Sequence, residues 1–314
     1  MSLAIYKPFA KLLFAGLGVF GMPLDVHRER PKFEAPIQRV GVVSVRAPIS
    51  YLSFDGRRVL MVPEFDLFID LPMDLKGVHV SRNYEAMVEV VELLDGKTFR
   101  LEDACGLMAR ELLKRHEYAS RSEVRAKGEV ITPKRAPVTE AKGYETFDVF
   151  ASAVARRDGS IRRSIGVGVV GLTACPCAQE LLKEGVTLPD DFPFGTHVQR
   201  AYGVLMTELP EGYELDVKKL YDIVERSFSS PTYGTLKRAD EKEVVERALK
   251  NPKFAEDCVR SMMDGFVESF PDLGDDVVVR FYVRSEESIH EHDLVAESVC
   301  ELGRLRSMRN GGQG

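Results

Sequence analysis

The sequence has little cysteine and no excess of positive charge. Its five cysteines in 314 residues are too few and odd in number for a disulfide framework, so we expect a reducing, cytoplasmic compartment. The 43 lysines and arginines against 49 aspartates and glutamates give a formal net charge of −6. This balance argues against a nucleic-acid-binding or membrane-binding protein, although a local basic pocket for a small polyanion stays possible.

The sequence also lacks a long apolar run. The uncharged stretch 12–22 falls far short of the roughly 20 residues that span a bilayer, and it contains three glycines. We expect residues 1–35 to form an N-terminal extension, with an export signal as the less favoured alternative. Residues 303–314 are rich in glycine and arginine and are expected to form a flexible tail. GxGxxG and P-loop signatures are missing, so nucleotide binding by those routes is not supported.

The hydrophobic pattern divides the rest into two halves, 36–158 and 159–302, with nearly the same order of elements. In the first half, alternating or β-branched runs predict strands and 3.6-residue periodicity predicts helices. The expected strands are 37–46, 65–71, 123–132 and 144–155, and the expected helices are 84–94 and 101–116. In the second half the expected strands are 165–172, 197–209, 277–283 and 294–300, with helices after Asp216 and over 240–270, broken near Asn251-Pro252. The order ββααββ predicts an α+β fold with antiparallel sheets.

A short octet occurs once in each half. Residues 77–84 and 195–202 are identical at five of eight positions, including His79 and His197. We expect the first copy to end a strand and the second to begin one. Internal duplication is therefore a hypothesis that depends mainly on the element order.

The most informative segment is Thr-Ala-Cys-Pro-Cys-Ala-Gln, residues 173–179, which follows an apolar strand. Cys175 and Cys177 precede a helix start, where the positive end of the helix dipole favours a thiolate for metal binding or nucleophilic attack. Two buried structural cysteines are an equally weighted alternative. Cys105 and Cys258 lie on apolar helical stripes and are expected to be structural thiols.

Three histidines stand near other functional groups. His197 lies in Gly-Thr-His-Val-Gln-Arg, and His290 and His292 lie in Glu-Ser-Ile-His-Glu-His. If that last segment continues the preceding strand, both rings project from one face and suit a metal or a proton relay. A polar hairpin end is the alternative. His27 and His116 look incidental, and His79 stays ambiguous.

Two charged segments complete the set. Leu-Lys-Arg-Ala-Asp-Glu-Lys, residues 236–242, has the composition of a solvated helix start, and Glu256 in Asn-Pro-Lys-Phe-Ala-Glu-Asp would ordinarily be a surface acid. Taken in their order along the chain, the five motifs quoted above resemble those of the type IB GTP cyclohydrolases, most closely their archaeal branch, the MptA enzymes. The resemblance covers roughly residues 36–300, and five ordered motifs are far more specific than one.

This resemblance implies tandem tunnelling-fold units with helices on one face of the sheet, assembled into a homo-oligomer, a dimer or tetramer, with active sites between subunits. Cys175, His197 and Glu241 match the metal-binding positions. The family expectation is Fe(II), one per subunit, although a thiolate, an imidazole and a carboxylate would also take Zn(II) or Mn(II).

The implied reaction opens the imidazole ring of GTP at C8 and releases formate. Cys175, Glu287, His290 and His292 match catalytic positions, with the last three serving as acid and base, and Cys177 is expected beside the metal. Glu256 matches the position that anchors guanine. Arg82, Arg200, Lys237 and Arg238 are candidates for the triphosphate from charge alone.

The archaeal branch makes 7,8-dihydroneopterin 2′,3′-cyclic phosphate for methanopterin-type cofactors, whereas the bacterial branch stops at dihydroneopterin triphosphate on the folate or queuosine route. Two further hypotheses compete with a cyclohydrolase. A tunnelling-fold nitrile reductase would use a cysteine nucleophile and NADPH and need no metal. A non-catalytic scaffold would hold a structural metal, and removing that metal would melt the assembly.

Overall fold

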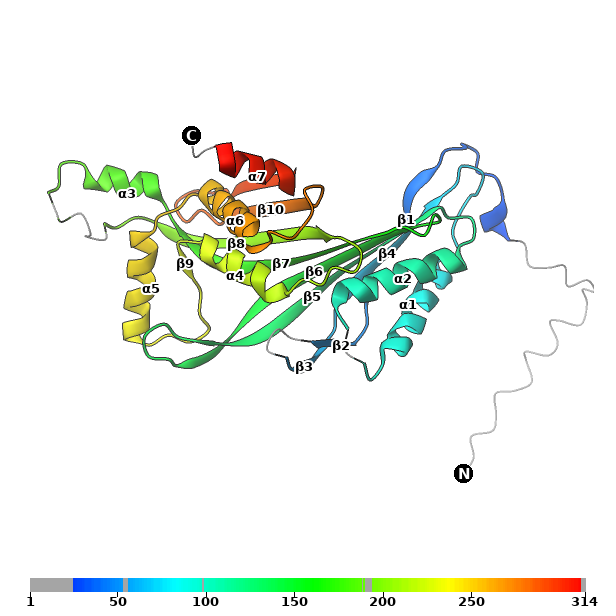
Figure 1. Cartoon of the computed structure of the whole chain (residues 1–314), viewed down its shortest axis with the longest axis horizontal. Coiled ribbons are helices and arrows are strands. Elements are labelled where there is room, and N and C mark those ends of the chain that lie inside the picture. The colour runs from blue at the N-terminus through cyan, green and yellow to red at the C-terminus, as the bar shows by residue number, and fades with distance from the viewer. Residues whose placement is uncertain (1–24, 53–55, 98, 188, 190–193, 312–314) are drawn as a thin grey trace, which may run out of the picture.

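The computed structural model describes residues 25–52, 56–97, 99–187, 189 and 194–311. Its main feature is one antiparallel sheet with the strand order β1-β4-β5-β6-β7-β8-β10-β11, and β9 pairs with β7 beside it (Figure 1). The helices lie on one face of this sheet. The predicted α+β class, with an antiparallel sheet and helices on one face, is therefore confirmed.

The first half of the chain supplies four strands of the sheet and two helices. Its elements are η1 (Val26–Arg28), β1 (Ile37–Arg46), β2 (Ile49–Leu52), β3 (Arg58–Met61), β4 (Glu64–Leu71), α1 (Ser81–Leu94), α2 (Leu101–Arg115), β5 (Arg121–Arg135) and β6 (Lys142–Arg156). The strand predicted from the alternation over 65–71 is confirmed as β4, in which Phe65, Leu67 and Ile69 are buried and their neighbours are half-buried. The helix α2 buries its predicted stripe, including Cys105, against β5 and β6.

The second half repeats this plan with more helices. Its elements are β7 (Ile161–Ala174), α3 (Pro176–Lys183), β8 (Val198–Leu209), α4 (Val217–Ser227), β9 (Ser230–Pro231), α5 (Arg238–Lys250), α6 (Ala255–Ser269), β10 (Val278–Ser285), β11 (Leu294–Glu301) and α7 (Leu302–Gly311). Asp216 caps α4 as predicted, since its side chain accepts from the Lys218 N–H at 2.9 Å. The predicted break at Asn251-Pro252 is also present, between α5 and α6.

The two halves share one continuous sheet. Strands β6 and β7 pair directly, with Ala151 opposite Ile165, and the turn between them contains Gly159 at φ +90°, a conformation that favours glycine. The expected boundary near residue 158 falls at this turn, and the division into two units stays a prediction. Cys258 lies on the buried face of α6 as expected, and all five cysteines are free thiols.

Two expectations about the ends of the chain have different outcomes. Residues 303–311 do not form the expected loose tail, because they belong to α7, which buries Leu302 and Leu305, whereas residues 312–314 lie outside the described residues. Arg306 fixes this helix by donating to the carbonyls of Phe270, Pro271 and Leu273 at 2.9–3.1 Å. The stretch 12–22 lies outside the described residues. Among the described helices, none is long and apolar enough to cross a membrane.

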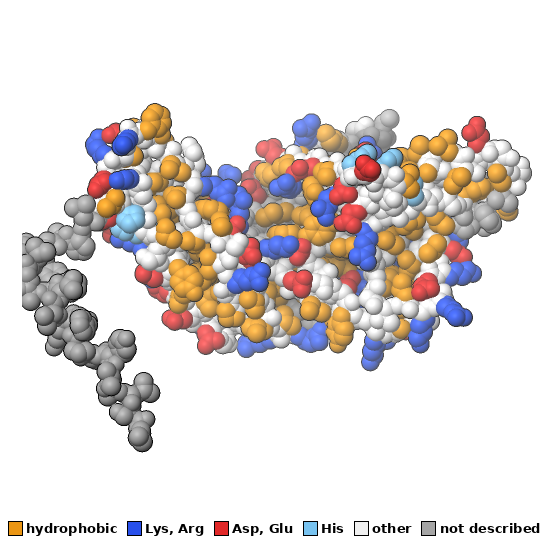
Figure 2. Space-filling view, turned by 180° about the vertical axis from the view of Figure 1, so that it is seen from behind, with side chains coloured by type: hydrophobic (Ala, Val, Ile, Leu, Met, Phe, Trp, Pro, Cys, Tyr) orange, Lys and Arg blue, Asp and Glu red, His pale blue; other side chains and the backbone are white. Residues whose placement is uncertain are grey.

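The octets fall in different surroundings. Residues 77–80 form a loop that leads into α1, whereas residues 195–197 lead into β8. The expectation that the first copy ends a strand is wrong, since β4 ends at Leu71. The helix-free face of the sheet is seen in Figure 2, where charged and apolar side chains are mixed.

Candidate functional site

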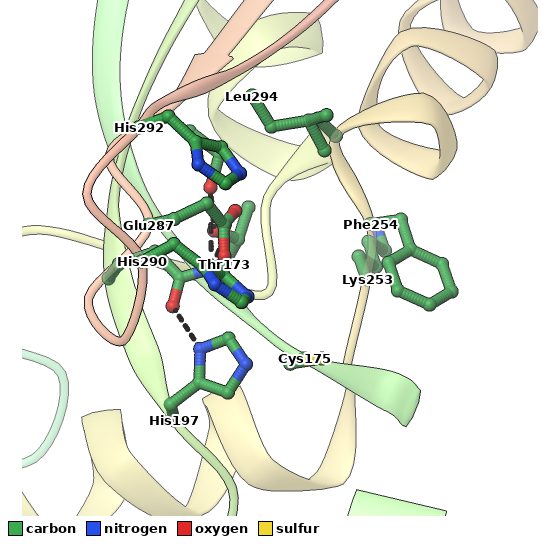
Figure 3. A pocket seen from close by; sticks show the side chains of 12 residues that line it. Thr173, Cys175, His197, Lys253, Phe254, Glu287, His290, His292 and Leu294 are labelled. Atoms are coloured by element: carbon green, nitrogen blue, oxygen red, sulfur yellow. Dashed lines mark hydrogen bonds between the residues drawn. The ribbon is translucent and has the colours of Figure 1, made fainter. Parts of the chain in front are cut away.

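The candidate site is a cavity of about 220 Å³ at the end of the sheet where β7 ends and β8 begins (Figure 3). Five residues singled out from the sequence line it, namely Cys175, His197, Glu287, His290 and His292. They come from three segments far apart in the chain, which the pairing of β7, β8 and β10 brings together.

Cys175 and His197 are joined through their backbones. The Cys175 N–H donates to the His197 carbonyl at 3.1 Å, and the Thr196 hydroxyl donates to the Cys175 carbonyl at 2.8 Å. Cys175 is also the N-cap of α3, where its sulfur accepts from the Ala178 N–H at 3.5 Å. The positive end of the helix dipole therefore faces this sulfur atom.

Gln199 sets the tautomer of His197. His197 Nδ1 lies 2.9 Å from Gln199 Oε1, and Gln199 Nε2 lies 3.3 Å from both carboxylate oxygens of Glu287. A carboxylate only accepts, so the amide nitrogen must face Glu287 and the amide oxygen must face His197. In the neutral ring, His197 Nδ1 therefore carries the proton, and Nε2 is the nitrogen that can bind a metal.

The two remaining histidines lie on the loop 286–293 between β10 and β11. This segment does not continue the strand but forms a hairpin end, the alternative given above, because β10 ends at Ser285 and the chain turns back. The rings of His290 and His292 still share one side, stacked with centroids 5.1 Å apart and planes 18° apart. In Figure 3 both rings lie close to Glu287 at the same wall of the cavity.

The cavity has further polar walls that the sequence reasoning missed. Gln199 and Lys253 line it, as do the hydroxyls of Thr173 and Ser285, which lie 3.1 Å apart. Lys253 donates to the Ser227 carbonyl at 2.8 Å, and burial lowers the pKa of its ammonium group. Gln199 and Lys253 both belong to motifs quoted above, so membership in those motifs was the signal that could have identified them.

Glu241, Lys237 and Arg238 lie away from this cavity, at the N-terminal end of α5. Asp240 anchors that end to the tip of the β5–β6 hairpin by accepting from the Val138 and Thr139 N–H groups at 2.9 and 2.8 Å. The C-terminal end of α5 contacts α3 instead, because Gln179 donates to the Leu249 carbonyl at 2.7 Å. Eight residues of helix separate Glu241 from Leu249, about 12 Å along the axis.

The other predicted residues lie around the cavity or beyond it. Glu256 follows Ala255, which lines the cavity, and is exposed on the first turn of α6. Arg200 on β8 and Cys177 on α3 are exposed and are not part of the cavity wall. Arg82 lines a different cavity and donates to the Arg115 carbonyl at 3.1 Å.

A group of side chains suited to a metal ion lies elsewhere. Among the described residues, Asp25, His27 and His79 form the one group of three or more whose ligand atoms all lie within 4.8 Å of one another. It belongs to the end of the sheet opposite the cavity of Figure 3. The predicted set of Cys175, His197 and Glu241 is divided between two regions of the single chain and stays a prediction.

Comparisons with known proteins agree with the sequence motifs. The family model described as type I GTP cyclohydrolase folE2 matches residues 23–296. Proteins named GTP cyclohydrolase MptA are similar along nearly their whole length. One from Methanococcoides burtonii is 42% identical over 302 residues, covering 90% of this chain and 95% of that protein. One from Methanocella arvoryzae, named GTP cyclohydrolase MptA 1, is 41% identical over 298 residues with the same two coverages.

Solved structures resemble the chain in fold alone. A hyper-thermostable uricase mutant superposes with a TM-score of 0.54 over 84% of this chain and 91% of that chain, at 8% identity. The uricase of Arthrobacter globiformis gives a TM-score of 0.52, with 84% and 93% coverage and 8% identity. The architecture is thus tunnelling-fold-like, as predicted.

Proposed function

Since this chain belongs to the type I GTP cyclohydrolase folE2 family, we propose that it is a metal-dependent GTP cyclohydrolase. It opens the imidazole ring of GTP at C8 and releases formate. One observation carries the proposal: the sheet gathers Cys175, His197, Glu287, His290 and His292 around one cavity. A soft thiolate, a free imidazole nitrogen and three acid–base groups are what such a hydrolysis needs.

Cys175 and His197 fit a divalent cation, with Fe(II) as the expected ion, one per subunit, and Zn(II) or Mn(II) as substitutes. A cation held there would supply hydroxide at neutral pH, because it lowers the pKa of water toward about 7. The third ligand, Glu241, comes from a neighbouring copy in a dimer or tetramer. The position of Glu241 supports this, since it lies in the first turn of α5 and does not line the cavity of its own chain.

Glu287, His290 and His292 move the protons that attack, ring opening and formate departure require. Gln199 holds Glu287 by donating to its carboxylate, so the carboxylate is aimed at the cavity before substrate arrives. The stacked imidazoles of His290 and His292 stand beside it and can donate or accept at neutral pH.

Substrate recognition combines an acid and several cations. Glu256 can accept from N1–H and the 2-amino group of guanine together. Arg200, Lys237 and Arg238 are the cations proposed for the triphosphate, and Lys253 adds a cation at the cavity itself. Lys237 and Arg238 lie on the same helix end as Glu241, so a neighbouring copy would contribute all three together.

The proposed product is 7,8-dihydroneopterin 2′,3′-cyclic phosphate, formed with loss of pyrophosphate for methanopterin-type cofactors. The similarity to proteins named MptA along nearly their full length supports it over the triphosphate product. Five free thiols, two of them near the proposed cation, fit a reducing cytoplasmic compartment.

The test is an anaerobic assay with GTP and Fe(II), with formate and phosphate-containing products measured separately. We expect formate and pyrophosphate from the wild type and background formate from Cys175→Ser and His197→Ala. Cys300→Ser is the matched control, since this half-buried thiol on β11 does not line the cavity. Full formate release from His197→Ala, or from metal-free wild type, would contradict the proposal.

A further inference from the structure

A second group of metal-ligating side chains lies at the far end of the sheet. The 3-10 turn η1 packs beside the loop that leads into α1, at the opposite end of the molecule from α3 (Figure 1). Histidine side chains accordingly appear at two separate places in Figure 2. This region is no part of the proposed catalytic site, and the sequence reasoning left its histidines as incidental or ambiguous.

The three side chains face a common point. His27 Nδ1 lies 3.4 Å from one carboxylate oxygen of Asp25, and His79 Nε2 lies 3.4 Å from the other. The two imidazole rings have centroids 4.5 Å apart. Ligand atoms bound to zinc in a tetrahedron are about 3.3–3.5 Å from one another, given bonds of about 2.0–2.2 Å. The two 3.4 Å separations fall in this range, although each histidine is closest to a different oxygen of Asp25, and the three ligand atoms all lie within 4.8 Å of one another.

Backbone hydrogen bonds hold the two segments in this arrangement. The Lys76 and Gly77 N–H groups both donate to the His27 carbonyl at 3.2 Å, and the Lys76 N–H also lies 2.9 Å from the Glu29 carbonyl. A side chain at position 77 would meet His27 Cδ2 at 3.1 Å, so Gly77 lets the imidazole approach closely. The ligand positions therefore do not depend on side-chain contacts alone.

Buried polar groups support the His79 side. Asn83 donates to the Leu67 carbonyl at 3.1 Å, so its amide oxygen accepts from His116 Nε2 at 2.9 Å. His116 Nδ1 must then accept from the Tyr118 hydroxyl, also at 2.9 Å. Burial, with Arg82 nearby, lowers the pKa of His116 to about 4, so the ring is neutral in this chain of hydrogen bonds.

We propose that Asp25, His27 and His79 bind a divalent transition-metal ion, distinct from the catalytic ion and serving a structural role. Two imidazoles and one carboxylate suit Zn(II), Fe(II), Co(II) or Ni(II). A cavity of about 360 Å³ borders both histidines and leaves room for a water ligand. The bound ion joins residues 25–29 to the loop before α1.

The surrounding charges are mixed. Arg28 contacts Asp25 at 3.3 Å, but its side chain is 75% exposed and is free to turn into solvent when an ion binds. Arg82 and Glu117 both border the cavity, and Glu29 pairs with Lys76 nearby. Binding of the ion therefore replaces the ion pair between Arg28 and Asp25. Because this pair is solvent-exposed, breaking it costs little free energy.

The test uses the full chain with Cys175→Ser and His197→Ala, so that the catalytic cation cannot bind. After chelation and dialysis, zinc is added and the bound metal is measured by equilibrium dialysis with elemental analysis. We expect one equivalent of zinc per chain, lost in each of Asp25→Asn, His27→Ala and His79→Ala. Glu117→Gln, a neighbouring acid outside the ligand set, is the matched control and should keep it.

A second measurement separates binding from folding. Zinc should raise the unfolding temperature of this double variant and of the control, but not that of the three ligand variants, because only a native site gains from the ion. Cobalt(II) bound here should show ligand-field bands without a thiolate charge-transfer band. Failure of the parent double variant to bind zinc, or equal binding after all three ligand changes, would overturn the proposal.

Discussion

The two ends of the sheet contain similar octets, identical at five of eight positions, in different surroundings. His197 leads into β8 beside Cys175, Gln199 and Glu287, whereas His79 leads into α1 beside Asp25 and His27. One neighbourhood offers a thiol and several groups that move protons. The other offers a carboxylate and imidazoles alone. Under the two proposals, a similar histidine serves as a metal ligand at both places, and its neighbours determine whether the bound ion is catalytic or structural.

The largest effect is expected when the proposed third ligand of the catalytic site is removed. Glu241→Gln should reduce formate release to background, as His197→Ala does, because either change leaves the cation with too few ligands. Mixing the two inactive variants and allowing subunits to exchange should restore about a quarter of wild-type activity. Half the random pairs are mixed, and each mixed pair holds one intact site of two. Activity that stays at background would place Glu241 outside a shared site.

A smaller effect is expected from the loop 286–293. His290→Ala should lower the rate of formate release by about 10²–10⁴-fold, the usual contribution of a general acid or base. Bound metal should be unchanged, since the cation does not depend on this ring. Ile289→Ala is the matched control, because the neighbouring side chain is 63% exposed and does not line the cavity. An equal loss in both variants would indicate a disturbed loop instead of a missing proton carrier.

A positioning effect should follow from Gln199. Gln199→Leu removes the acceptor for His197 Nδ1 and the donor to Glu287 together, and we expect about a 10–100-fold loss of metal affinity. Gln199→Glu keeps the acceptor, so it should bind metal better than the leucine variant. Its added carboxylate faces Glu287, which raises the pKa of the pair and moves the pH–rate profile to higher pH. Identical metal affinity and pH profiles in both variants would contradict this role.

The smallest effect on catalysis, together with a clear effect on stability, is expected from a substitution of Glu102 in the first half of the molecule. Burial of Glu102, in the first turn of α2, raises the pKa of its carboxyl group from 4.5 to about 7. The folded state thus holds a proton that the unfolded chain releases. The protonated Glu102 therefore contributes fully to the free energy of unfolding below about pH 4.5, and this contribution is lost as the pH rises through 7. The loss is roughly 3 kcal/mol by pH 8.

Glu102→Gln should remove most of this pH dependence. Urea unfolding at pH 5 and pH 8 measures it, and formate release should stay near wild type. Glu92→Gln, an exposed acid on α1, is the control that should leave the pH dependence intact. The same fall in stability between pH 5 and pH 8 in wild type and Glu102→Gln would show that another group is responsible.

Local patterns predicted the fold well because burial follows periodicity. When one face must be buried, the alternation over β4 fits only a strand and the apolar stripe on α2 fits only a helix. The helix α7 was missed because its stabilising contacts are not local: two buried leucines and the donors of Arg306 meet the end of α6. Glycine and arginine content indicated a tail, and tertiary packing overrode it.

The candidate site was predicted unevenly, for a physical reason. Ordered motifs identified Cys175, His197 and the Glu287 loop, and strand pairing brings them together. Gln199 was missed because its role is a hydrogen bond between two other side chains, which spacing along the chain does not encode. Asp25, His27 and His79 were missed for the same reason, since only the packing of η1 on the loop before α1 brings them together.

The placement of α5 has a consequence for how a complete site would be assembled. This helix is about 20 Å long and contacts α3 through Leu249, while Glu241 lies at the opposite end. If Glu241 serves the adjacent copy, each α5 carries a ligand away from its own cavity and toward the next subunit. Every complete catalytic centre would then depend on contact between two copies of the chain.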